Sequence, residues 1–222
     1  MSKLWCFGDS FTFGHGCRPD GPMSEYYYKY KKDGDDLWVN ILAKELNLEP
    51  INLGICGASN DYILDTIIEN FNDIKEGDIV SVNKTFPQRF DVENQVTKKL
   101  GPVIGELPET MDEGGWKKWL EILCRSQEEV ETLINYTLFF AQSDLFRERQ
   151  DKRFDFIVDR IKERNIEVIM WRTNEGICNH GLERIWDHTN RKLMDGHFSF
   201  KGHKQFAEVL YKLIKNDGKT VI

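Results

Sequence analysis

The stretch that decides the fold is residues 3–11, which read KLWCFGDSF. Its first part, Lys3–Phe7, is an apolar run of the length of a buried strand, and a Gly-Asp turn follows it directly. Three other short apolar runs are each followed by small or polar residues: Pro50–Ile55, Asp78–Val82 and Ile166–Trp171. We therefore predict four buried strands.

Between and after these runs lie segments with the apolar spacing of an amphipathic helix. The clearest are residues 38–46, 64–71 and 206–214. Residues that commonly cap helices precede the first two, at Asp35-Asp36 and at Ser59-Asn60-Asp61. Strands that alternate with helices indicate βαβ units, so we predict the α/β class with a parallel sheet that is covered on both faces.

Residues 91–150 are longer than a crossover between two strands needs. They contain turn-forming pairs at Gly101-Pro102 and Gly114-Gly115, and we expect one helix from about Ser126 to Arg149. An apolar group with helical spacing precedes that helix, at Trp116, Trp119, Leu120 and Leu123. We interpret this group as the core of the insertion, with a lid or a subunit contact as the alternative. We therefore predict a single domain over residues 1–222 with a helical insertion at about 91–150.

The chain is acidic: 30 Lys and Arg stand against 37 Asp and Glu among 222 residues, a formal net charge of −7 at pH 7. Binding to phosphates needs clustered Lys and Arg, so we expect no nucleic-acid partner. No apolar stretch reaches the roughly 18–20 residues of a membrane helix, and the apolar start is too short for a signal peptide. We therefore expect no membrane association and a cytoplasmic or virion-associated protein. Five cysteines without a CxxC pair indicate reduced thiols rather than a metal site.

Ser10 ends the Gly-Asp-Ser turn after the first predicted strand. In open α/β sheets, ligands bind outside the carboxyl ends of the strands, so this hydroxyl can face a crevice. The N-terminus of a following helix would direct backbone N–H groups at negative charge that develops there. A serine at this place also serves as a turn residue or a helix cap, so the role of nucleophile needs a partner base.

A suitable base occurs just before the last predicted helix, in Asp195-Gly196-His197. His197 can act as general base because unperturbed imidazole titrates near neutral pH. Asp195, two residues earlier, can hold the other ring nitrogen and fix the tautomer. His203, which begins the last helix, is expected to cap or to pack.

Two glycines lie three residues apart after the second predicted strand, at Gly54 and Gly57. Glycines in a strand-to-helix turn permit close approach of the backbone to a ligand. The N–H groups of Gly57 and Ser10 can together form an oxyanion hole. Glycines that only make the turn are the alternative.

Together these blocks resemble the SGNH (GDSL) hydrolase superfamily in their order along the chain. The resemblance implies a flavodoxin-like three-layer α/β/α sandwich with a central parallel sheet and no cofactor. It also implies the activity of an esterase, a lipase or an acetyl-esterase of carbohydrates. By the resemblance, Ser10 is the nucleophile, Gly57 an oxyanion donor, His197 the base and Asp195 the acid that orients it. Asp187-His188 is a less favoured pair, because its flanks match no block of the family.

The third block differs from the family, which has Gly-x-Asn-Asp after the third strand with the asparagine as an oxyanion donor. Here Asn83 is the nearest asparagine, and Thr85 and Asn60 are the alternatives. The acid also lies two rather than three residues before the histidine. Asp9, Asn60, Thr85 and Arg89 are candidates for binding the substrate, and a structural ion pair is the alternative for Arg89.

The predicted function is hydrolysis of an ester, with an acetyl or short-chain ester on a carbohydrate as the expected substrate. The alternative is a catalytically impaired module of the same fold that binds carbohydrate or belongs to a virion. The altered third block, the tyrosines of residues 26–30 and the Trp-rich insertion favour that alternative. A flavodoxin-like phosphate site at Ser10–Gly14 ranks last, because it leaves Asp195 and His197 unexplained. The expected partner is a small-molecule or glycan ester, and the sequence predicts no oligomeric state.

Overall fold

The computed structural model describes residues 1–14, 37–87, 89–93, 100–103, 126–136, 143–173, 184–187, 192–198 and 200–215. Four parallel strands form the central sheet in the order β2-β1-β3-β6. Their bounds are β1 Lys3–Phe7, β2 Glu49–Asn52, β3 Ile79–Lys84 and β6 Glu167–Arg172. The four predicted strands and their parallel arrangement are therefore confirmed.

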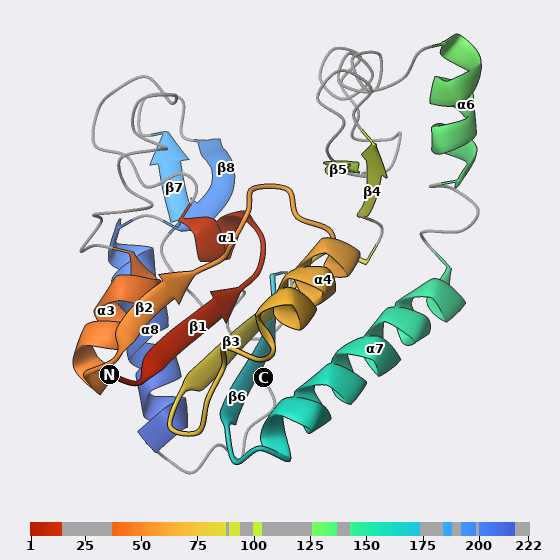
Figure 1. Ribbon diagram of the computed structural model, residues 1–222. Helices are drawn as coiled ribbons and strands as arrows, with labels where there is room; N and C mark the ends of the chain where they lie inside the picture. The colour runs from red at the N-terminus through yellow and green to blue at the C-terminus, as the bar shows by residue number, and fades with distance from the viewer. Residues whose placement is uncertain are drawn as a thin grey trace.

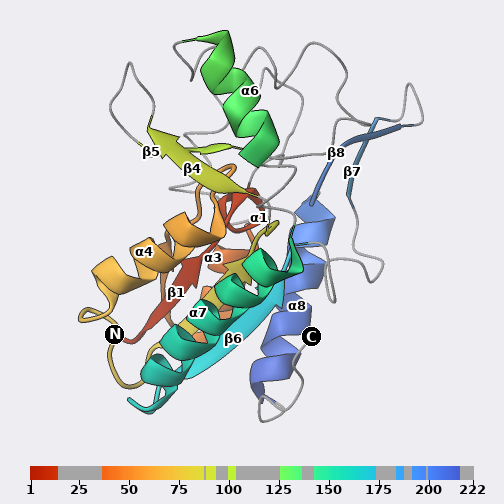
Figure 2. The same cartoon turned by 90° about the vertical axis from the view of Figure 1, so that its right-hand side faces the viewer.

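Two pairs of helices cover the two faces of this sheet (Figures 1 and 2). Helices α3 (Trp38–Leu46) and α8 (Phe200–Lys215) pack on one face, and α4 (Asn60–Asn70) and α7 (Asp144–Lys162) pack on the other. The fold is thus a three-layer α/β/α sandwich.

Strand β1 shows how the sequence produces these layers. Leu4 and Cys6 are buried in the core beneath α3 and α8, whereas Trp5 and Phe7 are buried in the core beneath α4 and α7. Successive strand residues point to opposite faces, so an uninterrupted apolar run can serve both cores at once. Burial in the first core also raises the pKa of the Cys6 thiol, which keeps it neutral.

The smaller elements lie at the end of the molecule toward which the parallel strands point (Figures 1 and 2). They are the one-turn helix α1 (Ser10–Phe13), the antiparallel pair β4 (Phe90–Glu93) and β5 (Leu100–Val103), helix α6 (Gln127–Tyr136), and the antiparallel pair β7 (Arg184–Asp187) and β8 (Lys192–Phe198).

Two sequence predictions need correction, one about the helix at residues 126–149 and one about the third strand. The single helix expected from about Ser126 to Arg149 is instead two helices, because α6 ends at Tyr136 and Ser143 caps the start of α7 through Phe146 N–H at 3.2 Å. Helix α7 then runs past residue 150 and buries Phe154 against the sheet, so this helix belongs to the sandwich. The Trp116 to Leu123 group and residues 15–36 lie outside the described residues.

The predicted third strand, Asp78–Val82, also ends too early. Strand β3 continues to Lys84 because Asn83 and Lys84 pair with Trp171 and Arg172 of β6. This register places the side chain of Asn83 inside the molecule, which bears on its expected role below.

Candidate active site

Ser10 is the first residue of α1 and follows directly from strand β1. The helix exists because Asp9 caps it: the Asp9 carboxylate accepts a hydrogen bond from Phe11 N–H at 3.0 Å. Asp9 C=O accepts the N–H groups of Thr12 and Phe13, and the turn ends at Gly14, whose N–H donates to Ser10 C=O. This one turn therefore fixes Ser10 at the carboxyl end of the central strand.

His197 reaches Ser10 from the far end of the chain. Its Nε2 lies 2.7 Å from Ser10 Oγ, although 187 positions separate the two residues. Strand β8 carries His197, and the imidazole packs on the Phe11 ring with centroids 4.6 Å apart. When Nε2 accepts the Ser10 hydroxyl proton, this is the geometry of a nucleophile and its base.

Asp195 is also a residue of β8, two positions before His197. Its side chain lies outside the described residues, so its role stays a prediction. For the less favoured pair, Asp187-His188, Asp187 ends β7 and His188 lies outside the described part of the chain.

The predicted oxyanion turn lies beside the nucleophile. Ile55 N–H donates to Gly8 C=O at 3.0 Å, which joins this turn to the end of β1. A Cβ on Gly54 would lie 2.8 Å from the backbone carbon of Thr12, so only glycine lets the turn approach α1 this closely. Gly57 has a φ of 78°. Within the described part of the chain, the N–H groups of Gly57 and Ser10 have no acceptor, which leaves them available to a ligand.

Asp9 is the centre of a buried polar cluster rather than a residue on the surface of a pocket. Its side chain is 0% exposed, and both carboxylate oxygens accept hydrogen bonds. The donors are Asn83 Nδ2 at 2.7 Å, Thr85 Oγ1 at 2.8 Å, Thr173 Oγ1 at 3.0 Å and Arg89 at 3.1 Å, besides Phe11 N–H. In this arrangement the Asp9 carboxylate is engaged within the protein, and its bond with Phe11 N–H supports the turn that carries Ser10.

The same cluster changes the expected roles of Thr85 and Arg89. Thr85 Oγ1 donates to Asp9 and accepts from Arg89 at 2.7 Å, so it is engaged within the protein. Arg89 is buried, pairs with Asp9 and stacks its guanidinium on Phe86 with the centroid at 4.5 Å. The structural ion pair that the sequence left as an alternative for Arg89 is therefore what the structure contains.

The side chains of Asn83 and Asn60 are hydrogen-bonded inside the protein. Asn83 is 0% exposed and donates to Asp9, and its Oδ1 lies 3.0 Å from Thr173 Oγ1, whose single proton it shares with Asp9. Asn60 is also buried; its amide group donates to Thr85 C=O and Gln150 and accepts from Thr85 N–H. Both side chains join secondary-structure elements inside the molecule. The third oxyanion donor expected from the family pattern is therefore unassigned among the described residues.

His203 packs, as the sequence predicts, in the first turn of α8. It is 1% exposed, and Nδ1 accepts a hydrogen bond from Trp38 N–H at 3.3 Å. Burial, with a smaller contribution from the nearby charge of His197, lowers the pKa of His203 from 6.5 to about 3. The ring is therefore neutral at working pH, with its proton on Nε2.

This buried histidine predicts a pH dependence of stability. The pKa of His203 is lower in the folded state than in the unfolded chain. The contribution of the neutral ring to stability is therefore fully present above pH 6.5 and is lost as the pH falls toward 3. We expect a loss of about 2 kcal/mol between pH 7 and pH 5 from this residue. His203→Asn keeps an acceptor for Trp38 N–H without the titration. Urea unfolding at the two pH values should therefore show a smaller difference for the variant, and equal differences would contradict the assignment.

No sequence pattern indicates the ion cluster that lies at the ends of β3 and β6. Lys84 Nζ lies 3.0 Å from Asp151 Oδ1, and Arg172 donates to both Asp151 oxygens at 2.9 Å. Burial acts to raise the pKa of Asp151, but the two cations outweigh it, and the pKa is lowered. The cluster fixes α7 to the sheet.

The helix α4 that follows the oxyanion turn is fixed to β4 in a similar way. Ser59 caps α4 by accepting from Tyr62 N–H at 3.0 Å, and its hydroxyl donates to Asp91 of β4 at 2.5 Å. Burial raises the pKa of Asp91, and the nearby charges of Asp61 and Asp65 raise it further. The hydrogen bond from Ser59 acts in the opposite direction but does not outweigh them.

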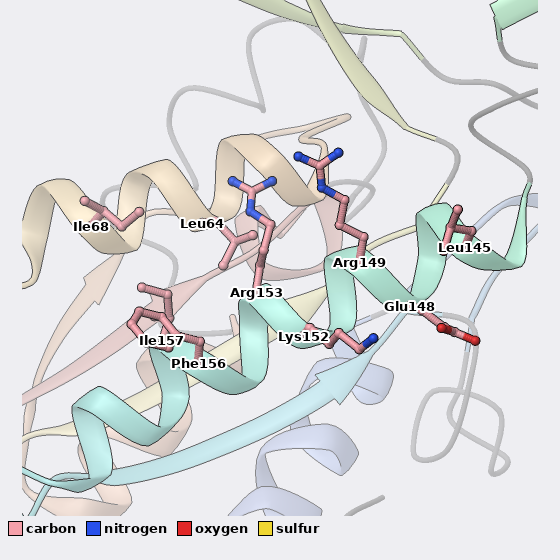
Figure 3. Close-up of a pocket in the computed structure, with 9 residues that line it drawn as sticks. All are labelled: Leu64, Ile68, Leu145, Glu148, Arg149, Lys152, Arg153, Phe156 and Ile157. Atoms are coloured by element: carbon pink, nitrogen blue, oxygen red, sulfur yellow. The ribbon is translucent and has the colours of Figure 1, made fainter.

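A cavity of about 620 Å³ lies away from this site, in the groove between α4 and α7 (Figure 3). Leu64 and Ile68 line it from α4, and α7 contributes Leu145, Glu148, Arg149, Lys152, Arg153, Phe156 and Ile157. Arg153 reaches across to pair with Asp61. None of the residues that the sequence assigns to the site lines this groove.

Among the residues that the structure describes, no group of three or more His, Cys, Asp or Glu side chains is arranged to hold a metal ion. Among the same residues, no helix has the length and apolar character needed to cross a membrane.

Comparison with known proteins gives structural neighbours only. No protein-family model and no curated protein matches the sequence. The chain is similar to a protein assigned to the G-D-S-L lipolytic family from Desulfitobacterium hafniense DCB-2, at 14% identity and a TM-score of 0.37, over 96% of this chain and 99% of the other. A G-D-S-L lipolytic family member from Veillonella parvula DSM 2008 shows 15% identity and a TM-score of 0.39, over 99% and 100%.

A third neighbour is a carbohydrate esterase whose active site displays divergent catalytic and non-catalytic binding functions. It shows 12% identity and a TM-score of 0.41, over 100% of this chain and 67% of that one. At such identities and TM-scores, the activity of this chain has to be inferred from its own site.

Proposed function

We propose that this chain is a serine hydrolase of the SGNH type that cleaves an ester. The observation that carries the proposal is the 2.7 Å distance between Ser10 Oγ and His197 Nε2. Two residues from opposite ends of the chain meet here in the geometry that activates a nucleophile, at the carboxyl end of a parallel sheet where ligands bind. We further propose an acetyl or short-chain ester on a carbohydrate as the substrate.

In the proposed reaction, Ser10 Oγ attacks the ester carbonyl while His197 Nε2 takes the hydroxyl proton. The N–H groups of Ser10 and Gly57 stabilise the oxyanion of the tetrahedral intermediate. His197 then gives its proton to the departing alcohol, which leaves an acyl group on Ser10. Water attacks this acyl-enzyme, with His197 again as base, and the acid is released. Asp195 is proposed to orient His197 through the other ring nitrogen.

The experiment that tests this proposal is labelling with a fluorophosphonate, read by intact mass and by the modified peptide. We expect one label per chain, on Ser10, because this probe reports an activated serine without a guess about the natural ester. His197→Ala should lower the labelling rate by about 10³-fold or more, since the base is then missing.

A matched control is Ser59→Ala, which removes a buried serine of the neighbouring helix cap and should leave labelling at Ser10. Absence of label on a folded wild-type protein would contradict the proposal and favour the binding module. Label on another serine would contradict the assignment of Ser10.

A further inference from the structure

Trp38 makes hydrogen bonds to the turn that carries Ser10 and to the helix that follows the strand of His197. Its indole Nε1–H donates to Phe11 C=O at 3.0 Å, and Phe11 follows Ser10 in α1. Its backbone N–H donates to Nδ1 of His203 at 3.3 Å, in the helix that follows the strand of His197. Trp38 is 0% exposed, at the start of α3.

The bond to Phe11 matters because α1 has only one turn. The last carbonyl groups of a helix have no partner within the helix and need donors from outside. In α1, Gly14 N–H donates to Ser10 C=O, Trp38 Nε1–H donates to Phe11 C=O, and Asn52 Nδ2 donates to Thr12 C=O at 2.9 Å. Side chains of α3 and β2 therefore help to hold the turn in place.

Phe11 also supports the base. Its ring lies 4.6 Å from the imidazole of His197, centroid to centroid, at an interplanar angle of 30°. The same ring meets Phe198 edge-on at 5.1 Å. A displacement of Phe11 would thus shift Ser10, its neighbour in the chain. It would also shift the ring on which the His197 imidazole packs.

We propose that Trp38 is a positioning residue for catalysis: its indole N–H holds Phe11 so that Ser10 Oγ and His197 Nε2 keep their hydrogen-bond distance. Trp38 contacts no reacting atom and acts through Phe11. This inference rests on the proposed function, and the experiment below separates the two.

Trp38→Phe tests the role, because it keeps an aromatic ring in the core and removes the indole N–H. Trp171→Phe is a matched control. Trp171 is equally buried, at 2% exposure, and its ring lies 5.9 Å from that of Trp38 in the same core. Its indole N–H donates to Ser81 Oγ at 3.1 Å, in β3 rather than in the active-site segments.

We expect the maximal rate of fluorophosphonate inactivation, kinact, to fall about tenfold in Trp38→Phe, which is the effect of one misplaced neutral hydrogen bond. The probe concentration at half-maximal rate, KI, should change less than about twofold, because the binding surface is intact. Trp171→Phe should stay within about twofold of wild type in both values, each variant being measured at the same interval below its unfolding midpoint.

Equal kinact values for the two variants would overturn the role of Trp38 and leave the proposed function standing. An unlabelled wild type would overturn the proposed function and this inference with it. If Trp38→Phe does not fold, incorporation of benzothienylalanine at position 38 replaces the N–H by sulfur at nearly constant volume. A wild-type kinact in that protein would overturn the proposal.

Discussion

Replacing Ser10 with alanine is expected to lower ester turnover by at least about 10⁴-fold while the protein stays folded. Turnover should fall this far because the substitution removes the proposed nucleophile, the Oγ atom that lies 2.7 Å from His197 Nε2. The fold should persist because Asp9 supplies the helix cap, and its bond to Phe11 N–H does not involve the Ser10 side chain. Turnover on an activated acetyl ester and urea unfolding would measure both effects.

Ser143→Ala provides the opposite control. Ser143 caps α7 through Phe146 N–H, so its loss should reduce the free energy of unfolding by about 1 kcal/mol with turnover nearly unchanged. For Ser10→Ala we expect the reverse, a change in that free energy below about 1 kcal/mol. A Ser10→Ala protein that keeps a tenth of the wild-type rate would contradict the assignment of the nucleophile.

The pairing of Ser10 with His197 could be predicted from sequence because chemistry restricts it so strongly. A serine at the end of a buried strand can act as a nucleophile only if a base is present. The Asp-x-His segment before the last helix is a suitable source of that base, so the two segments together indicate a catalytic pair. The sheet was predictable for a related reason: apolar runs such as Lys3–Phe7 are too short for helices and too apolar for loops.

The buried cluster around Asp9 could not be predicted in the same way. Asn83 and Thr85 come from the end of β3, Thr173 follows β6 and Arg89 precedes β4, and only the folded chain brings the four to one carboxylate. Polar residues at strand ends look alike in sequence whether they face a ligand or one another. The sequence therefore offered Asp9, Thr85 and Arg89 as substrate contacts, and the three-dimensional register makes them a support for Ser10.

The strand β8 was also missed, and its composition shows why. Lys192–Phe198 reads KLMDGHF, which has neither the alternation of a half-buried strand nor the β-branched residues typical of strands. It is a strand because it pairs with β7 in an irregular antiparallel ladder. Tertiary pairing overrides local preference there, at the segment that carries His197.

Breaking the buried Asp9–Arg89 pair is expected to have the largest effect on stability. Asp9→Asn should reduce the free energy of unfolding by about 3–5 kcal/mol. It removes the buried carboxylate that pairs with the Arg89 guanidinium, and it turns an amide N–H₂ toward hydroxyl donors. Urea unfolding measures this change.

Arg89→Met should cost less than Asp9→Asn by at least about 1 kcal/mol, because the carboxylate keeps its donors from Phe11, Asn83, Thr85 and Thr173. The double variant should lose less stability than the sum of the two single variants, since the pair acts as a unit.

Kinetic measurements on Arg89→Met decide whether Arg89 supports Asp9 or binds the substrate. If Arg89 only supports Asp9, KM stays within about twofold of wild type at a temperature where Arg89→Met is folded. A KM raised tenfold or more in a protein of nearly wild-type stability would instead mean that Arg89 binds the substrate. In that case Asp9 would support Ser10 without help from Arg89.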